Sequence, residues 1–422
     1  ARWTLDAQFS YHWNKNTTLT LGAESSLIVS ADPQNANPAL RVTRFEATTA
    51  NITSGAQIGL SLQSLLLDPT VFTVVKATTL TSGTLSQTLL QNAPFLYVAQ
   101  ASANNTLGEV YLEVRRRTTA ELGFRTAQAE AYNAVFDALK YDSGIQGALL
   151  SKTDAAGLAS VYDQLLPDQG EGVFSALDNT SQLMSNMVDA RPDPEQRVGG
   201  DSVWLQEVNG RVSRETTSTL GSDVKAFGLI GGYESMASDG SAYGLTLAFV
   251  SAQDDDSIAA VGEHVVASML EAGAYARYTP GNWRFTVRGS GGFASLDSTR
   301  RFVTTGVQRQ AEASWNGYFA TGHAMAAYEA RWGRFYARPE LSIDYLYLSE
   351  GARTESGGGE GFNLEVSSRK SDRLTGSAIM VVGAQWGRTT WLRTEFRAGY
   401  RSIISGQVGD TTARFINATG TP

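Results

Sequence analysis

The chain has no cysteine, only 3 histidines and 10 prolines among its 422 residues, and no long apolar run. Without cysteine it can form neither a disulfide framework nor a thiolate metal site. Three histidines scattered along the sequence make no metal cluster, so we expect no cofactor. A transmembrane helix needs about 18 consecutive apolar residues, which the chain lacks. The net charge of −8 argues against a nucleic-acid partner.

What the C-terminal half does have is strict alternation of side chains. Between Trp283 and Phe293, apolar residues and glycine take one set of alternate positions, and arginine, threonine and serine take the other. A strand with two such faces suits lipid on one side and water on the other, which is typical of an outer-membrane β-barrel. β-Strands are also the membrane spans that a hydropathy search misses.

Alternating segments of this kind follow one another from Asp201 onward, and we count nine. They lie near residues 202–212, 224–235, 242–253, 264–279, 283–297, 313–330, 335–348, 373–387 and 391–402. The short connections are 236–241, 280–282, 332–334 and 388–390, and the long ones are 213–223, 254–263, 298–312 and 349–372. Outer-membrane barrels have short periplasmic turns and long external loops, so the first strand is predicted to start in the periplasm.

Charged residues of these strands share one face, which we assign to the barrel lumen. Burying them in a dry core would be costly, whereas a wet lumen lets them pair across it. The predicted lumen-facing residues are Glu271, Arg277, Arg284, Arg288, Glu329, Arg338, Glu340, Asp344, Arg393, Glu395 and Arg397. His323 is expected to face the lumen as well. The predicted aromatic girdle beside the short turns consists of Trp283, Trp332, Tyr336, Trp386 and Trp391. A soluble all-β domain with ordinary aromatic strand ends is the alternative.

Residues 119–190 change from the period of a strand to that of a helix. Apolar residues recur at helical spacing in 132–139 and again in 158–165, the second stretch after a possible cap at Thr153. A third helix is predicted over 171–190, with an apolar face on one side. Its other face carries Asp178, Gln182, Ser185 and Asp189. At about 1.5 Å per residue this helix is roughly 30 Å long, enough to cross a bilayer-thick lumen.

Residues 1–118 read as short β segments separated by polar residues and glycine, for example at 56–62, 70–75 and 109–114. Strands at this spacing indicate either a sandwich or a parallel β-helix solenoid, and we favour the solenoid.

The odd number of strands sets an expectation about the ends of the chain. Single-chain bacterial barrels have an even number of strands, and an open barrel would leave unpaired edges in lipid. Residues 403–422 read as another long loop. We therefore expect the sequence to stop short of the natural C-terminus. No signal peptide is visible at the start, so we also expect the N-terminus to be a cut.

The order of these modules, rather than any one motif, carries a resemblance. Tyr243-Gly-Leu-Thr-Leu-Ala-Phe and Phe335-Tyr-Ala-Arg-Pro-Glu-Leu-Ser-Ile-Asp-Tyr-Leu look like barrel strands of the classical autotransporters of type V secretion. Residues 70–98 look like the region that closes a pertactin-like β-helix. The chain thus resembles the end of an autotransporter passenger (1–118), a helical linker (119–190) and a β-barrel (201–422). The family barrel has twelve strands, of which about nine would be present here.

The resemblance implies an outer-membrane translocator that exports its own N-terminal passenger and anchors it at the surface of a Gram-negative bacterium. The helix at 171–190 would then lie in the lumen, and residues 20–118 would fold outside as an autochaperone-like segment. The implied partners are outer-membrane lipid and lipopolysaccharide, the barrel-insertion machinery, periplasmic chaperones and the passenger, and we expect a monomer. A porin-like channel remains open, as does a surface protease or esterase whose catalytic passenger lies before Ala1. An amphipathic helix outside the lumen is the alternative for 171–190.

Three short motifs invite a chemical interpretation, and each fits a structural role better. Gly200-Asp201-Ser202 resembles the serine block of GDS-type esterases, but none of the three histidines has the aspartate three residues before it that those enzymes need. Asp254-Asp-Asp lacks the ligand spacing of a Ca²⁺ loop and is expected in a solvated external loop. Arg115-Arg-Arg suits an exposed strand end, although it could contact lipopolysaccharide phosphates. We expect no enzyme within this chain.

Overall fold

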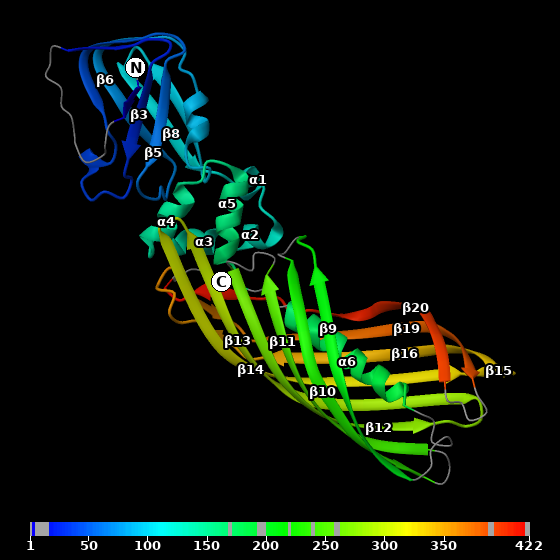
Figure 1. Ribbon diagram of the computed structural model, residues 1–422. Coiled ribbons are helices and arrows are strands. Elements are labelled where there is room, and N and C mark those ends of the chain that lie inside the picture. The colour runs from blue at the N-terminus through cyan, green and yellow to red at the C-terminus, as the bar shows by residue number, and fades with distance from the viewer. Residues whose placement is uncertain are drawn as a thin grey trace.

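The computed structural model describes residues 2–4, 17–167, 171–191, 200–217, 221–237, 241–256, 262–386 and 392–417. A β-rich N-terminal part, a group of short helices and a large curled sheet follow one another along the chain (Figure 1).

Parallel strands build the N-terminal part. One sheet joins β1 (Arg2–Thr4), β3 (Ser26–Ala31) and β5 (Gln57–Leu62) in parallel. The other joins β2 (Thr18–Leu21), β4 (Phe45–Ile52) and β6 (Thr70–Ser82) in parallel, and then the antiparallel hairpin of β8 (Glu109–Arg116) and β7 (Tyr97–Asn104). The 3-10 turns η1 (Pro38–Leu40) and η2 (Thr88–Asn92) lie between strands. This is the parallel arrangement of the predicted solenoid, with an antiparallel hairpin at its end.

Five short helices follow instead of the two that the sequence predicts before residue 171. They are α1 (Thr119–Leu122), α2 (Thr126–Glu130), α3 (Tyr132–Ala138), α4 (Ser143–Leu150) and α5 (Ala155–Tyr162), the last continued by η3 (Asp163–Leu165). α1 and α2 are one turn long and α4 begins with Ser-Gly, so none of them gives a clear helical period. The side chain of Asp154, not the predicted Thr153, caps α5 by accepting from Gly157 N.

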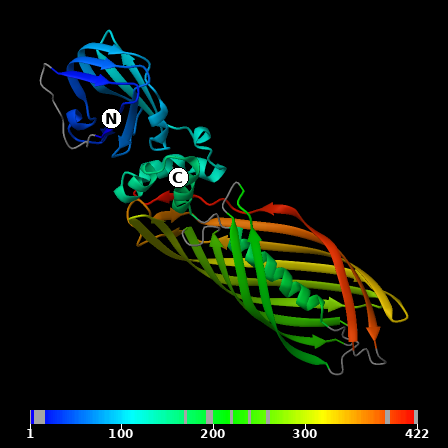
Figure 2. The ribbon, with the colours of Figure 1, turned by 45° about the horizontal axis from the view of Figure 1, so that its top comes forward.

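The last helix, α6 (Glu171–Asp189), is the long one. It lies along the concave side of the curled sheet (Figures 1 and 2). Among the described residues, no helix has the length and apolar content needed to cross a membrane.

All nine predicted barrel strands are present, in one antiparallel sheet that follows chain order. They are β9 (Asp201–Arg214), β10 (Ser222–Met236), β11 (Ser241–Asp256), β12 (Gly262–Tyr278), β13 (Trp283–Thr304), β14 (Val307–Tyr328), β16 (Phe335–Glu350), β19 (Arg369–Trp386) and β20 (Leu392–Gln407). A tenth, short strand, β15 (Ala330–Trp332), pairs with β16. Over the described residues the sheet is curled into a half-barrel with β9 and β20 at its edges (Figure 2).

The predicted long loop at 298–312 is wrong. β13 and β14 continue through it as a hairpin, and only residues 305–306 turn, where Gly306 has a φ of +82°. The alternation there is hidden because both faces are mainly polar. Phe302 and Ala311 of this extension are nevertheless buried, since they pack against the helical part of the chain.

Two other predicted loops also contain strands. In 349–372, β17 (Arg353–Thr354) pairs with β18 (Leu364–Val366), and β18 pairs with β21 (Ala413–Phe415) from the expected C-terminal loop. The three aspartates expected in a solvated loop are the end of β11. Asp254 is buried, and Asp255 Oδ1 lies 2.6 Å from the Nδ1 of His264 on β12.

Two separate apolar cores result. The first runs without a break from the N-terminal sheets through the short helices to Phe302, Phe362 and Phe415 at one end of the large sheet. The second lies between α6 and the concave face of β9 to β16.

Candidate functional site

The apolar side of α6 packs on the first strands of the sheet. Phe174, Leu177 and Met184 are buried in one cluster with Val208 and Ile230. Fully burying an aliphatic or aromatic side chain contributes about 1.5–3 kcal/mol, so this face helps to hold the helix against the concave face of the sheet. The approach is close at Gly210 of β9, where a Cβ would lie 2.8 Å from Asn179 Nδ2.

The acidic side of α6 reaches the far part of the sheet. Asp178 Oδ2 lies 3.1 Å from Arg373 Nη1 on β19, and its Oδ1 lies 3.2 Å from Arg401 Nη2 on β20. No lysine or arginine occurs between Glu171 and Asp189, so all the charged side chains of the helix are acidic. One carboxylate therefore connects the helix to two neighbouring strands.

The last turn of α6 is held by a histidine. His323, on β14, lies 3.1 Å through Nε2 from Asp189 Oδ2 and 2.7 Å through Nδ1 from Asp344 Oδ1 on β16. Carboxylates only accept hydrogen bonds, and an imidazole that donates from both nitrogens is the cationic form. The imidazole ring of His323 therefore lies between two carboxylates, one on the helix and one on the sheet, and connects the two elements.

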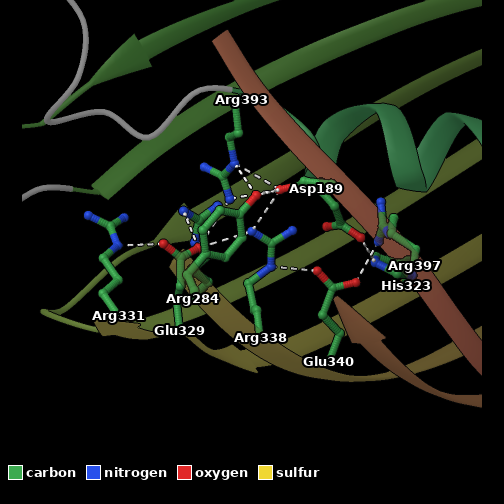
Figure 3. Close-up of polar contacts among 11 residues, drawn as sticks. Asp189, Arg284, His323, Glu329, Arg331, Arg338, Glu340, Arg393 and Arg397 are labelled. Carbon is green, nitrogen blue, oxygen red and sulfur yellow. Dashed lines mark hydrogen bonds and ion pairs between the residues drawn. The ribbon is translucent and has the colours of Figure 1, made fainter. Parts of the chain in front are cut away.

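Five arginines and three glutamates fill the concave face near the short turns (Figure 3). Glu329 Oε2 lies 3.2 Å from Arg284, 3.0 Å from Arg338 and 3.2 Å from Arg393. Arg331 adds a contact of 2.5 Å to Glu329 Oε1. Charges that would be expensive to bury singly are therefore shared among several partners.

The same network continues toward β20. Arg338 Nε lies 2.7 Å from Glu340 Oε1, whose other oxygen accepts from Arg397 at 2.5 Å. Glu395 lies 2.8 Å from Arg393 and 3.4 Å from Arg338. The network joins β13, β15, β16 and β20.

The remaining predicted lumen-facing residues are also in ion pairs on the concave side. Arg288 contacts Glu271, and the two side chains are 1 % and 4 % exposed. Arg277 Nε lies 3.2 Å from Glu234, a carboxylate that we did not predict, and its Nη1 donates to Arg191 O at 2.8 Å. Of the helix residues, Ser185 is buried and Gln182 half-buried, with Asp178 and Asp189 paired as above.

The girdle assignment of Tyr336 is wrong. Its side chain is 2 % exposed on the concave face, where its hydroxyl donates to Glu395 Oε1 at 2.6 Å and accepts from Arg393 Nε at 2.7 Å. Tyr336 has the same parity along β16 as Arg338, a signal that was available in the sequence. The neighbouring residue, Phe335, is the one whose aromatic side chain is exposed.

The other aromatic residues of the predicted girdle lie as follows. Trp283 and Trp332 are exposed, and the Trp283 ring centroid lies 5.1 Å from that of Tyr328. Trp386 is half-buried under the Arg334 guanidinium, 4.5 Å from its ring centroid. Trp391 lies outside the described residues.

Arg373, Arg401 and Glu234 were not predicted. His323 was expected to face the lumen, but its pairing with Asp189 and Asp344 was not predicted. Each completes a pair with a residue far away in sequence. Because all the charged side chains of the helix are acidic, basic residues were to be expected opposite it. The sequence does not indicate which strand supplies them. Among the described residues, no group of three His, Asp or Glu side chains is placed to hold a metal ion.

Comparison with known proteins gives two kinds of similarity. The translocator domain of the autotransporter NalP from Neisseria meningitidis is similar over 59 % of this chain and 82 % of that chain, at 15 % identity and a TM-score of 0.49. The β domain of the Bordetella autotransporter BrkA is similar over 51 % of this chain and 97 % of that chain, at 11 % identity and a TM-score of 0.31. No curated protein matches the chain.

The family model for the autotransporter β-domain matches residues 203–422, more than half of the sequence and the whole of the curled sheet apart from the first residues of β9. The chain therefore belongs to the autotransporter β-domain family, the outer-membrane translocator domains of Gram-negative bacteria.

Proposed function

We propose that this chain exports its own N-terminal passenger across the outer membrane and keeps the passenger attached at the cell surface. The observation that carries the proposal is the path of α6 along the concave face. The short helices that precede α6 contact the long-connection ends of β13 and β14, whereas β9, which follows it, starts at the short-turn end. The chain thus runs the length of the sheet before its first strand begins.

The charge pattern supports a permanent position for α6. The helix is anionic, and the strands opposite it supply Arg373, Arg401 and His323. A porin-like channel would keep this space open to solutes. A helix fixed on one side by apolar packing and on the other by ion pairs suits an anchor that fills the lumen.

The N-terminal sheets fit the end of a passenger. Their parallel strands share a continuous apolar core, so the segment is able to fold as soon as it leaves the lumen and to oppose its return. We assign the long-connection end of the barrel to the outside and the short-turn end to the periplasm. Outer-membrane lipid and lipopolysaccharide would surround the exposed apolar face, and the insertion machinery and periplasmic chaperones would act before that.

Single cysteines test this orientation cleanly, because the chain has none of its own. Thr217, in a long connection, and Asn282, in a short turn, are both exposed and form a matched pair. In intact cells that carry the full chain, a membrane-impermeant maleimide should label Thr217→Cys and leave Asn282→Cys unlabelled until the outer membrane is opened. An epitope placed before residue 17 should be reached by antibody on intact cells. A periplasmic epitope, or the reverse labelling, would overturn the proposal.

A further inference from the structure

A second junction joins the passenger side to the barrel, apart from α6. It lies at the outer end, where the β13–β14 hairpin and the loop 351–368 meet the short helices (Figure 1). We call residues 119–167 the helical cap, and the hairpin end with this loop the outer socket.

Arg300 of β13 is the centre of the junction. Its side chain is fully buried, and it forms a two-pronged ion pair with Glu355 in the loop, at 3.0 Å from Nε and 2.6 Å from Nη2. Nη2 also donates to Phe362 O at 2.5 Å, and the Phe362 ring centroid lies 3.9 Å below the guanidinium. All of these partners belong to the barrel side, so the socket can form without the cap.

The last two donors of Arg300 point at the cap. Nη1 donates to Gln164 O at 3.3 Å and to Leu165 O at 3.2 Å. These carbonyls end the turn after α5, where a helix leaves its carbonyl groups without partners and carries partial negative charge. With them in place, all five N–H groups of the guanidinium are used. The Gln164 side chain adds a further hydrogen bond between cap and barrel, since its Oε1 accepts from Val303 N on β13 at 2.8 Å.

A second contact lies at the other strand of the hairpin. Asp142 caps the start of α4 and also pairs with Arg309 of β14, at 2.6 Å from Nε and 3.0 Å from Nη2. The loop and the cap also pack closely at this contact. A Cβ on Gly361 of the loop would lie 2.8 Å from Asp142 Cβ and 3.0 Å from Ala138 O. The loop fits the cap only because this position has no side chain.

We propose that the outer socket is a docking site for the helical cap of the same chain, which seats there when export ends. The inference rests on the proposed function. Before export the cap is elsewhere, and Nη1 of Arg300 faces water. Once the cap is seated, Nη1 is buried against two carbonyl acceptors, and departure must break these two bonds together with the contacts of Gln164 and Asp142. The partner that the socket fits is the carbonyl end of the turn η3, formed by Gln164 and Leu165.

The test uses the full chain in intact cells and trypsin added outside, which cuts the cap after Arg125, Lys140 or Lys152 once the cap leaves the socket. Arg300→Met removes the central charge, and Gly361→Val is a wedge that leaves every charge in place. Arg300→Met should speed cap cleavage by roughly a hundredfold, the effect expected for breaking a buried charged contact. Gly361→Val should speed it by roughly tenfold or more, the effect expected for overpacking a close contact.

Arg301→Met is the matched control, because Arg301 is the next residue of the same strand and is exposed. It should leave the cleavage rate unchanged. The double variant Arg300→Met, Glu355→Leu removes both charges of this buried pair and should recover part of the protection. Equal cleavage of the natural chain, Arg300→Met and Gly361→Val would overturn the docking site while surface display of the epitope remains. Absence of the epitope from the surface of the natural chain would instead overturn export, and the docking site with it.

Discussion

Arg401, on the edge strand β20, places Nη2 3.2 Å from the Oδ1 of Asp178 on α6. The two residues are 223 positions apart in the sequence. This contact connects the two edges of the half-barrel through the helix, because α6 packs on the edge strand β9 and pairs with the opposite edge strand β20. The ion pairs of the concave face therefore act on the curvature of the sheet as well as on the position of the helix.

Asp178→Asn should loosen α6 without unfolding the sheet. The amide keeps the shape but leaves Arg373 and Arg401 without the helix carboxylate. Both arginines are partly exposed, so the loss is about 1–2 kcal/mol rather than the larger value of a dry pair. Planar-bilayer recordings should show more frequent open events and a preference for anions. Gln182→Ala, one turn further along the same helix, is the control; equal recordings for both variants would contradict the role of Asp178.

Tyr336→Phe should destabilise the barrel by about 1–3 kcal/mol, because a hydroxyl that joins Glu395 and Arg393 is lost from a buried network. The temperature at which the protein loses its compact gel mobility measures this change. Tyr345→Phe on the same strand is the matched control, since that ring is exposed on the outer face. A larger drop for Tyr345→Phe would restore the girdle assignment of Tyr336.

Leu341→Arg should prevent insertion or lower stability by about 2–4 kcal/mol, because Leu341 lies on the exposed apolar face of β16 and a charge in the middle of the bilayer is expensive. Leu341→Ala removes the same side chain without adding charge and should fold. The yield of heat-modifiable protein in outer-membrane fractions distinguishes the two. Normal yield of Leu341→Arg would mean that this face does not contact lipid.

The turn at the start of the helical cap should depend on pH. The Arg115 guanidinium, the Thr118 backbone N–H and the Thr118 hydroxyl donate to the Glu121 carboxylate and lower its pKa to about 2. A lowered pKa means that the stabilisation is complete above the ordinary pKa of 4.5 and is lost as the pH falls toward 2. Hydrogen exchange at Thr118 and Glu121, corrected for the intrinsic rate at each pH, should show protection falling in that window. Glu121→Gln should remove the pH dependence, and a dependence that persists would point to another group.

The barrel strands could be predicted because lipid and water enforce alternation on every residue between them. The same reasoning places Arg284, Arg288 and Arg338 on one face, and it would have placed Tyr336 there had parity been preferred to the local cluster of aromatic residues. It fails at 298–312, because both faces of the hairpin are mainly polar there and no alternation is visible. It also fails to identify the partners of Asp178, since contacts between residues about 200 positions apart leave no mark in a single sequence.

The long β13–β14 hairpin has a mechanical consequence. A pull on the surface segment reaches the barrel by two routes, one covalent through Pro167 and α6, and one through the seated cap into β13 and β14. A pull at the hairpin end would draw β13 and β14 together along their length. Their hydrogen-bond ladders with β12 and β16 would then resist in shear, with many bonds loaded at once, instead of peeling one bond at a time. If the proposed surface attachment holds, drag on the cell surface would be borne by the middle of the sheet, and α6, which is held by side chains alone, would be spared most of the tension.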